Sequence, residues 1–150
     1  MKSNFTIFFT FVCENELRRE YIKIAFYTLF EECKRIEIPV LVIDGSKKKD
    51  ANENKKIFND ANNLTYIHDE DENPFKRCNK YLNLIKTDYV LRLLEDCAFI
   101  NFSKNDFIAI KKDIKFLENH SNIDTINYPL VNDTKYSFEK NILKYHPISF

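Results

Sequence analysis

Glycine is almost absent from this chain, since Gly45 is the only one in 150 residues. An ordinary globular domain of this length carries about ten. The G-x-G-x-x-G dinucleotide fingerprint and the P-loop both need several positions without a Cβ. The sequence therefore excludes these two phosphate-binding loops, and a nucleotide would have to be held by other groups.

Net charge, long apolar runs and cysteine motifs are lacking as well. Basic and acidic side chains balance at 23 each, so no overall field favours nucleic acid or an anionic membrane. No apolar run approaches the roughly 20 residues of a transmembrane helix. The four cysteines share no C-x-x-C spacing, and nothing resembling a signal peptide precedes them. We expect a reduced, cytoplasmic protein with no transmembrane segment and no nucleic-acid partner.

The chain does contain an alternation of strand and helix patterns. Apolar, β-branched runs predict strands at Phe5 to Val12, Pro39 to Ile43, Leu64 to His68, Tyr89 to Leu94 and Ile123 to Leu130. Amphipathic patterns between them predict helices. This order predicts one α/β domain over residues 1–150, a three-layer α/β/α sandwich with a mostly parallel central sheet.

Three of the helix patterns are specific enough to name core faces. The first helix is predicted to be capped by Asn15 and a later one to begin at Asn73-Pro74. The predicted faces are Leu17, Tyr21, Ala25, Leu29 and Cys33, with Ile24 and Thr28 beside them; then Phe75, Cys78, Leu82 and Ile85; and then Phe107, Ile110, Ile114 and Leu117.

Polar residues follow two of the predicted strands directly. The Tyr89 strand ends at the adjacent carboxylates Glu95 and Asp96, and the Pro39 strand ends in the turn signature Asp44-Gly45-Ser46. Ligands of open α/β sheets bind at the carboxyl ends of the strands, where these residues would lie. The alternative is a strand that runs into a solvated acidic loop.

The order and spacing of "VLVIDGS" and "NPFKRCNKYLNLIKTDYVLRLLEDCAF" resemble a GT-A fold glycosyltransferase of the family 2 type, in its nucleotide-sugar-binding half. The resemblance covers about residues 5 to 130. It implies that Asp44, with Ser46 beside it, binds the nucleotide of a sugar donor, most simply a UDP-sugar. It also implies that Glu95-Asp96-Cys97 stands at the D-x-D motif, where Asp96 would bind Mn²⁺ or Mg²⁺ and the diphosphate, and Glu95 the metal.

The sequence departs from the family pattern at this motif. If Glu95 is the first acid, the second position is Cys97, a soft ligand poorly suited to Mg²⁺. If Asp96 is the second acid, the first position is Leu94, which has no ligand atom. The general base and acceptor site of such enzymes would follow the fifth strand, where about 20 residues remain. Catalytic residues and acceptor stay unassigned, and truncation at the carboxyl end stays open.

Three hypotheses for function follow. The chain is a glycosyltransferase domain, of the hexosyltransferase type, that binds a nucleotide sugar with a divalent metal. Alternatively it is an inactive GT-A-like binding or assembly module, which Leu94 and Cys97 favour. The third reading is a nucleotide-independent α/β domain in which Asp44, Glu95 and Asp96 are solvated loop ends.

Overall fold

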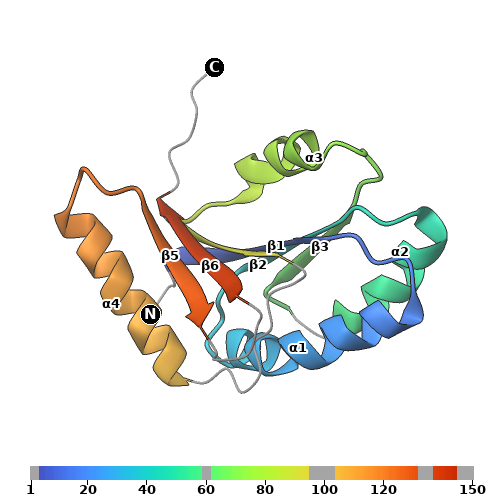
Figure 1. The fold of residues 1–150 in the computed structure, drawn as a ribbon, viewed down its shortest axis with the longest axis horizontal. Coiled ribbons are helices and arrows are strands. Elements are labelled where there is room, and N and C mark those ends of the chain that lie inside the picture. Colours follow the sequence, from blue (N-terminus) through green and yellow to red (C-terminus); the bar gives the residue numbers. More distant parts are fainter. Residues whose placement is uncertain (1–3, 59–61, 95–103, 132–136, 145–150) are drawn as a thin grey trace.

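A computed structural model describes residues 4–58, 62–94, 104–131 and 137–144. The helices and strands follow one another as β1 (Phe5–Phe11), α1 (Glu16–Arg35), β2 (Val40–Asp44), α2 (Lys48–Lys55), the 3-10 turn η1 (Lys56–Phe58), β3 (Leu64–His68), α3 (Pro74–Tyr81), the 3-10 turn η2 (Leu82–Leu84), β4 (Tyr89–Leu94), α4 (Lys104–Asn119), β5 (Thr125–Val131) and β6 (Ser137–Lys144). Figure 1 shows their arrangement.

The strands form one mixed sheet in the order β3-β2-β1-β4-β6-β5. Strand β1 is parallel to both of its neighbours, β2 and β4, and β2 is parallel to β3. The predicted parallel centre is therefore confirmed. Strand β6 is antiparallel to β4 and β5, and the sequence did not predict it. Its sequence, SFEKNILK, lacks strict alternation, so this strand depends on distant partners rather than on a local pattern.

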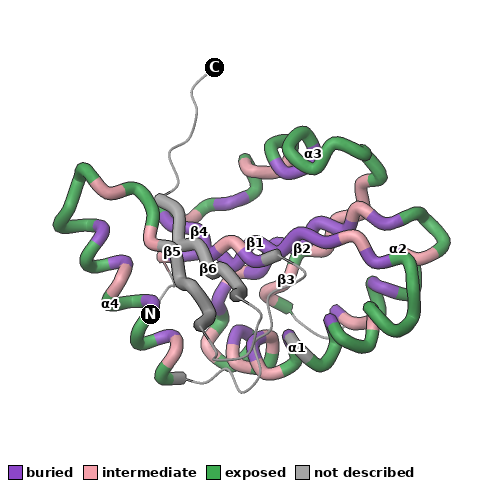
Figure 2. Tube along the Cα trace, viewed as in Figure 1, coloured by how far each residue is buried: buried purple, intermediate pink, exposed green. Residues whose placement is uncertain are grey.

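Helices cover both faces of the sheet, which confirms the three-layer α/β/α architecture (Figure 1). One buried cluster joins β1, β2 and β4 to α1 and α4 through residues such as Phe9, Phe26 and Ile110. A second, smaller cluster lies on the other face, where Cys78 and Ile85 pack with residues of β1, β2 and β4. We call these the α1 face and the α3 face of the sheet. Figure 2 shows the buried strands between the two layers.

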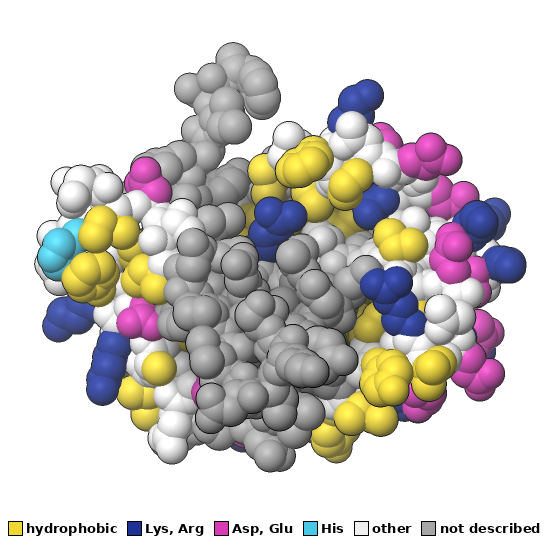
Figure 3. Space-filling model, viewed as in Figure 1, with side chains coloured by type: hydrophobic (Ala, Val, Ile, Leu, Met, Phe, Trp, Pro, Cys, Tyr) yellow, Lys and Arg dark blue, Asp and Glu magenta, His cyan; other side chains and the backbone are white. Residues whose placement is uncertain are grey.

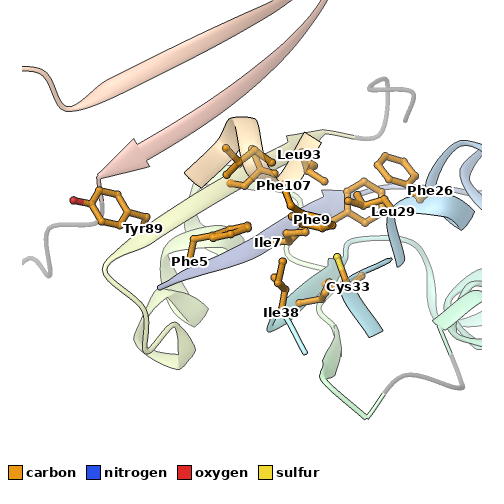
Figure 4. Close-up of a cluster of buried hydrophobic side chains, with 14 of the residues drawn as sticks. Phe5, Ile7, Phe9, Phe26, Leu29, Cys33, Ile38, Tyr89, Leu93 and Phe107 are labelled. Atoms are coloured by element: carbon orange, nitrogen blue, oxygen red, sulfur yellow. The ribbon is translucent and has the colours of Figure 1, made fainter. Parts of the chain in front are cut away.

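Aromatic side chains fill the centre of the α1 face. The ring of Phe9 lies 4.4 Å from that of Phe26 and 5.2 Å from that of Phe11, measured between centroids. Figure 4 shows Phe9 and Phe26 with Leu29 and Cys33 in this cluster. Burying one such phenylalanine contributes about 1.5–3 kcal/mol, so this cluster anchors α1 to the strands that carry the candidate site.

Helix α1 buries a different face from the one predicted. Leu17 and Tyr21 are 67% and 64% exposed, and the buried residues are Ile22, Phe26, Leu29 and Cys33. A step of four residues turns an α-helix by about 40° more than one full turn. A series of such steps from Leu17 therefore drifts around the helix: Leu17 and Tyr21 face solvent, whereas Leu29 and Cys33 reach the core. The predicted Asn15 cap is confirmed, because its side chain accepts a hydrogen bond from the Arg18 N–H.

The other two predicted helix faces differ in outcome. All four predicted core residues of α4 are buried: Phe107, Ile110, Ile114 and Leu117. Helix α3 begins as predicted, with Asn73 as cap and Pro74 in the first turn. Phe75, however, is 74% exposed, while Arg77 is buried. The prediction for Phe75 is wrong because α3 turns Arg77 and Cys78, rather than Phe75, toward the sheet.

Candidate functional site

The candidate site lies at the carboxyl ends of the parallel strands. The chain moves outward from β1 to β2 and β3, and then returns to add β4 on the other side of β1. The gap beyond the ends of β1 and β4 is therefore the topological switch point of the sheet. Leu94, the last residue of β4, is opposite Thr10 of β1. The described part of β4 thus ends beside the end of β1.

Asp44, at the end of β2, is fully buried and accepts three hydrogen bonds. Its Oδ1 accepts from the Ser46 N–H at 2.8 Å, and its Oδ2 accepts from Asn54 Nδ2 at 3.0 Å and from the Tyr66 hydroxyl. Burial, together with the bond to the Asp44 carboxylate, raises the pKa of Tyr66. The phenol therefore stays protonated and keeps donating to Asp44.

Asn54 of α2 ties the ends of β1 and β2 together. Its Nδ2 also lies 3.0 Å from Ser46 Oγ and 3.0 Å from the Cys13 carbonyl oxygen. The Cys13 N–H donates to Ser46 Oγ at 2.7 Å. On the other side, Arg19 of α1 donates from Nε to Asn54 Oδ1 at 2.8 Å. Two helices and two strand ends are thereby locked into one geometry, which favours a preorganised site.

The end of β3 supports the same turn from the other side. His68 Nε2 is hydrogen-bonded to the Ser46 carbonyl oxygen at 2.7 Å, and the Asp69 N–H donates to the Asp44 carbonyl oxygen at 2.9 Å. The Asp69 carboxylate accepts from Lys80 Nζ and from the Tyr81 hydroxyl, each at 2.8 Å. The hydrogen bond from Lys80, with the bond from Tyr81, lowers the pKa of Asp69 to about 2. Strand β3 and α3 are joined by this ionised carboxylate.

Gly45 stands where Arg77 leaves no room for a side chain. A Cβ built on Gly45 would lie 2.2 Å from Arg77 Cζ and 2.4 Å from Nη1. The guanidinium therefore lies directly on the backbone of this turn. Arg77 is 5% exposed, and its Nη1 donates to the Asp71 carbonyl oxygen. The only glycine of the chain is thus explained by a close approach rather than by an unusual backbone angle.

The structure brings together two of the four predicted site residues. Asp44 and Ser46 belong to one buried network, whereas Glu95 and Asp96, like Cys97, lie outside the described residues. Within the described parts of the chain, no group of three or more His, Cys, Asp or Glu side chains could hold a metal ion. The metal role of Glu95 and Asp96 and the nucleotide roles of Asp44, Ser46 and Asp96 stay predictions.

Sequence reasoning missed three residues of this site. Asn54 and Tyr66 hold the Asp44 carboxylate, and Arg77 covers Gly45. The period-two alternation could have placed Tyr66 on the same face as Asp44, because Tyr66 is opposite Val42 in the sheet. Asn54 lies in a polar helix with no motif around it. Arg77 offered one signal, which is a charged residue next to Cys78 in the predicted core stripe.

The described residues also line a cavity at the opposite edge of the sheet. It has a volume of about 210 Å³ and lies at the amino ends of β1 to β3. Its lining residues are Thr6, Pro39, Val40, Leu41, Asn63, Thr65, Leu84, Lys86 and Thr87. None of the predicted site residues is among them. Among the described helices, none is long and apolar enough to cross a membrane.

Comparison with known proteins yields matches in structure but not in sequence. No protein-family model matches the chain, and no curated protein matches it. S. aureus TarS, residues 1–349, aligns with a TM-score of 0.56 and 17% identity, over 96% of this chain and 47% of TarS. The same protein in complex with UDP-GlcNAc aligns with a TM-score of 0.53 and 21% identity, over 83% of this chain and 33% of that one.

A cytidylyltransferase from Leptospira borgpetersenii also matches, with a TM-score of 0.55 and 14% identity over 94% of this chain and 60% of that protein. These identities are low, so the matches show the fold alone. The chain spans about half the length of the TarS 1–349 structure or less. The fold is the α/β fold that TarS and the cytidylyltransferase share.

Proposed function

We propose that this chain is the donor-binding domain of a glycosyltransferase, which binds a nucleoside diphosphate sugar, most simply a UDP-sugar, at the carboxyl edge of its sheet. One observation carries the proposal: a buried hydrogen-bond network fixes the Asp44-Gly45-Ser46 turn beside the end of β1, next to the switch point between β1 and β4. One of the matching structures is TarS in complex with UDP-GlcNAc, and this match supports the choice of ligand class.

Asp44 supplies recognition of the base in this proposal. An ionised carboxylate has about four acceptor positions, and the internal donors of Asp44 use three of them. We assign the remaining position to the imide N–H of uracil, which has to reach a carboxylate that its neighbours cover completely. The network of Asn54 and Tyr66 holds the carboxylate in one orientation, so little conformational entropy is lost when the base binds. Ser46 is held by the same network and borders the nucleoside.

Asp96, with Glu95, would hold the Mn²⁺ or Mg²⁺ ion, because hard cations prefer carboxylate oxygens. The ion would offset the charge of the diphosphate leaving group as the sugar is transferred to an acceptor. One carboxylate can suffice when the diphosphate and water complete the shell. Cys97 is too soft a ligand to add to such a site.

The second candidate is a GT-A-like module that binds a nucleotide without transferring a sugar. Leu94 and Cys97 favour it, since each would replace an acid of the family motif. Calorimetric titration with UDP, with and without Mn²⁺, separates the candidates. Binding that Mn²⁺ strengthens supports the donor-binding domain, and binding that is equally strong with and without Mn²⁺ supports the inactive module. The absence of binding under both conditions would contradict both and leave a nucleotide-independent domain.

A further inference from the structure

Arg77 is a buried positive charge without an acidic partner. It is 5% exposed, and none of the described residues forms an ion pair with it. Its Nη1 donates to the Asp71 carbonyl oxygen, while its buried Nε has no hydrogen-bond partner in the described part of the chain. Unpaired buried charges are strongly unfavourable, so a site that retains one usually compensates it with a ligand or another charge.

Arg92 of β4, on the α3 face of the sheet, resembles Arg77 in having a buried donor that the described residues leave without an acceptor. Val90 belongs to the cluster on the α3 face, and Arg92 follows it by two residues, so its side chain leaves the strand on that face. Arg92 is half-buried, and its buried Nε has no hydrogen-bond partner among the residues that the structure describes. Among the described residues, no acid is paired with it.

The two arginines lie on either side of β1 on this face, Arg77 beyond the end of the strand and Arg92 opposite its middle. The Arg77 guanidinium lies on Gly45, one residue beyond the position opposite Phe11, and Arg92 is opposite Phe8. Gly45 and the Arg92 Cα are therefore offset by about 13 Å along the strands and about 10 Å across them. An arginine side chain that extends toward the carboxyl end shortens this offset. Figure 3 shows dark blue basic side chains between hydrophobic ones on the side of the molecule that carries α3.

A diphosphate offers negative charge and hydrogen-bond acceptors to the two guanidinium groups. Guanidinium groups bind phosphate oxygens through parallel N–H donors, and they keep their charge at any physiological pH. The sequence offers the metal site fewer acids than the family motif, because Leu94 and Cys97 stand at its possible positions. A weakly held ion leaves more of the diphosphate charge for the protein to neutralise.

We infer that Arg77 and Arg92 bind the diphosphate of the nucleoside diphosphate from the α3 face, so that the nucleotide binds without a metal ion. This inference rests on the proposed function and specifies which side chains neutralise the donor. It predicts that EDTA lowers the affinity for UDP only in part, and that UDP in EDTA still binds more tightly than uridine.

The test is calorimetric titration in EDTA with UDP, uridine and pyrophosphate. Arg77→Lys keeps the charge but loses the planar donor pair, and Arg92→Gln removes the charge. Each variant should lower the affinity for UDP at least tenfold and leave that for uridine unchanged. Lys76→Gln, an exposed neutralisation on α3, is the matched control and should bind UDP as the parent does. Arg92 is less buried than Arg77, so Arg92→Gln decides the question if Arg77→Lys does not fold.

Several outcomes would overturn the inference. Parental affinity for UDP in both arginine variants would show that neither side chain meets the diphosphate. Equal binding of pyrophosphate and UDP would identify a general anion site rather than a nucleotide site. UDP binding that requires Mn²⁺ would leave the proposed function intact and refute the arginine site. A parent protein that binds no UDP with or without Mn²⁺ would refute the proposed function, and this inference with it.

Discussion

The guanidinium of Arg77 lies on the backbone of Gly45, so closely that a Cβ at position 45 would be 2.2 Å from Arg77 Cζ. This contact joins α3 to the turn that follows β2. It also gives the only glycine of the chain a physical reason that composition could not supply. The turn beside it holds Asp44 and Ser46, so packing on the α3 face and the hydrogen-bond network on the α1 face fix the same three residues.

Gly45→Ala should destabilise the protein by about 1–3 kcal/mol, because the added methyl group displaces a buried guanidinium. Urea unfolding measures this change. The backbone angle of Gly45 is not in the left-handed region, so the clash is the source of the strain. In an Arg77→Ala background the substitution should therefore destabilise the protein much less, because the effects of mutations at two contacting residues are not additive. The same loss in both backgrounds would contradict the assigned contact.

Asp44→Asn should weaken the binding of UDP by about 1–3 kcal/mol, because it removes the charged acceptor proposed for the base. Calorimetry measures the affinity, and thermal unfolding measures the structural effect. Tyr66→Phe is the matched control, since it removes one internal donor but keeps the carboxylate. It should lower the melting temperature and weaken UDP binding much less than Asp44→Asn does. Unchanged affinity in Asp44→Asn would leave Asp44 as a structural aspartate only.

Asp96→Ala should abolish the metal-dependent part of UDP binding, since Asp96 is the proposed main ligand of the ion. The difference between the UDP affinity measured in Mn²⁺ and that measured in EDTA gives this part. Glu95→Ala should have a smaller effect, because adjacent residues at a strand end project to opposite sides. Cys97→Asp should tighten Mn²⁺ binding if Glu95 and position 97 form the acidic pair. A parental response of Asp96→Ala to Mn²⁺ would eliminate the proposed metal site.

Asp69 should make the folded state sensitive to acid. Lys80 and Tyr81 lower its folded-state pKa to about 2, below the value of about 3.9 expected when the chain is unfolded. Its contribution to stability is therefore present above about pH 4 and is lost as the pH falls toward 2. Asp69→Asn should flatten the dependence of the unfolding free energy on pH in this range. Glu72→Gln, an exposed change of equal charge in the same run, should retain it.

The alternation of buried strands and helices predicted the layers of the fold and its parallel centre correctly. It did so because strands buried on both faces are apolar throughout and remain recognisable without their partners. Strand β6 could not be found this way, since its pairing with β4 and β5 is antiparallel and its own pattern is weak. The predicted face of α1 is correct at Leu29 and Cys33 and wrong at Leu17 and Tyr21, because residues every four positions do not stay on one side of a helix.

The candidate site was predictable only where a residue ends a strand. Asp44 and Ser46 follow an apolar run and could be assigned to the carboxyl edge from sequence. Asn54 and Arg77 belong to helices. Asn54 contacts Asp44, which is 10 residues away in the sequence, and Arg77 contacts Gly45, which is more than 30 residues away. Such contacts leave no local pattern. The one local signal for Arg77 is its place next to Cys78 in the predicted core stripe, and that signal does not reveal the contact with Gly45.

The most direct test of the central claim is where UDP binds. Amide chemical shifts recorded during a UDP titration should change most at Cys13, Gly45 and Ser46, at the carboxyl ends of β1 and β2. They should change little at Asn63 and Lys86, which line the cavity at the opposite edge. Large changes at that cavity, or none anywhere at millimolar UDP, would contradict a nucleotide site at the carboxyl edge of the sheet.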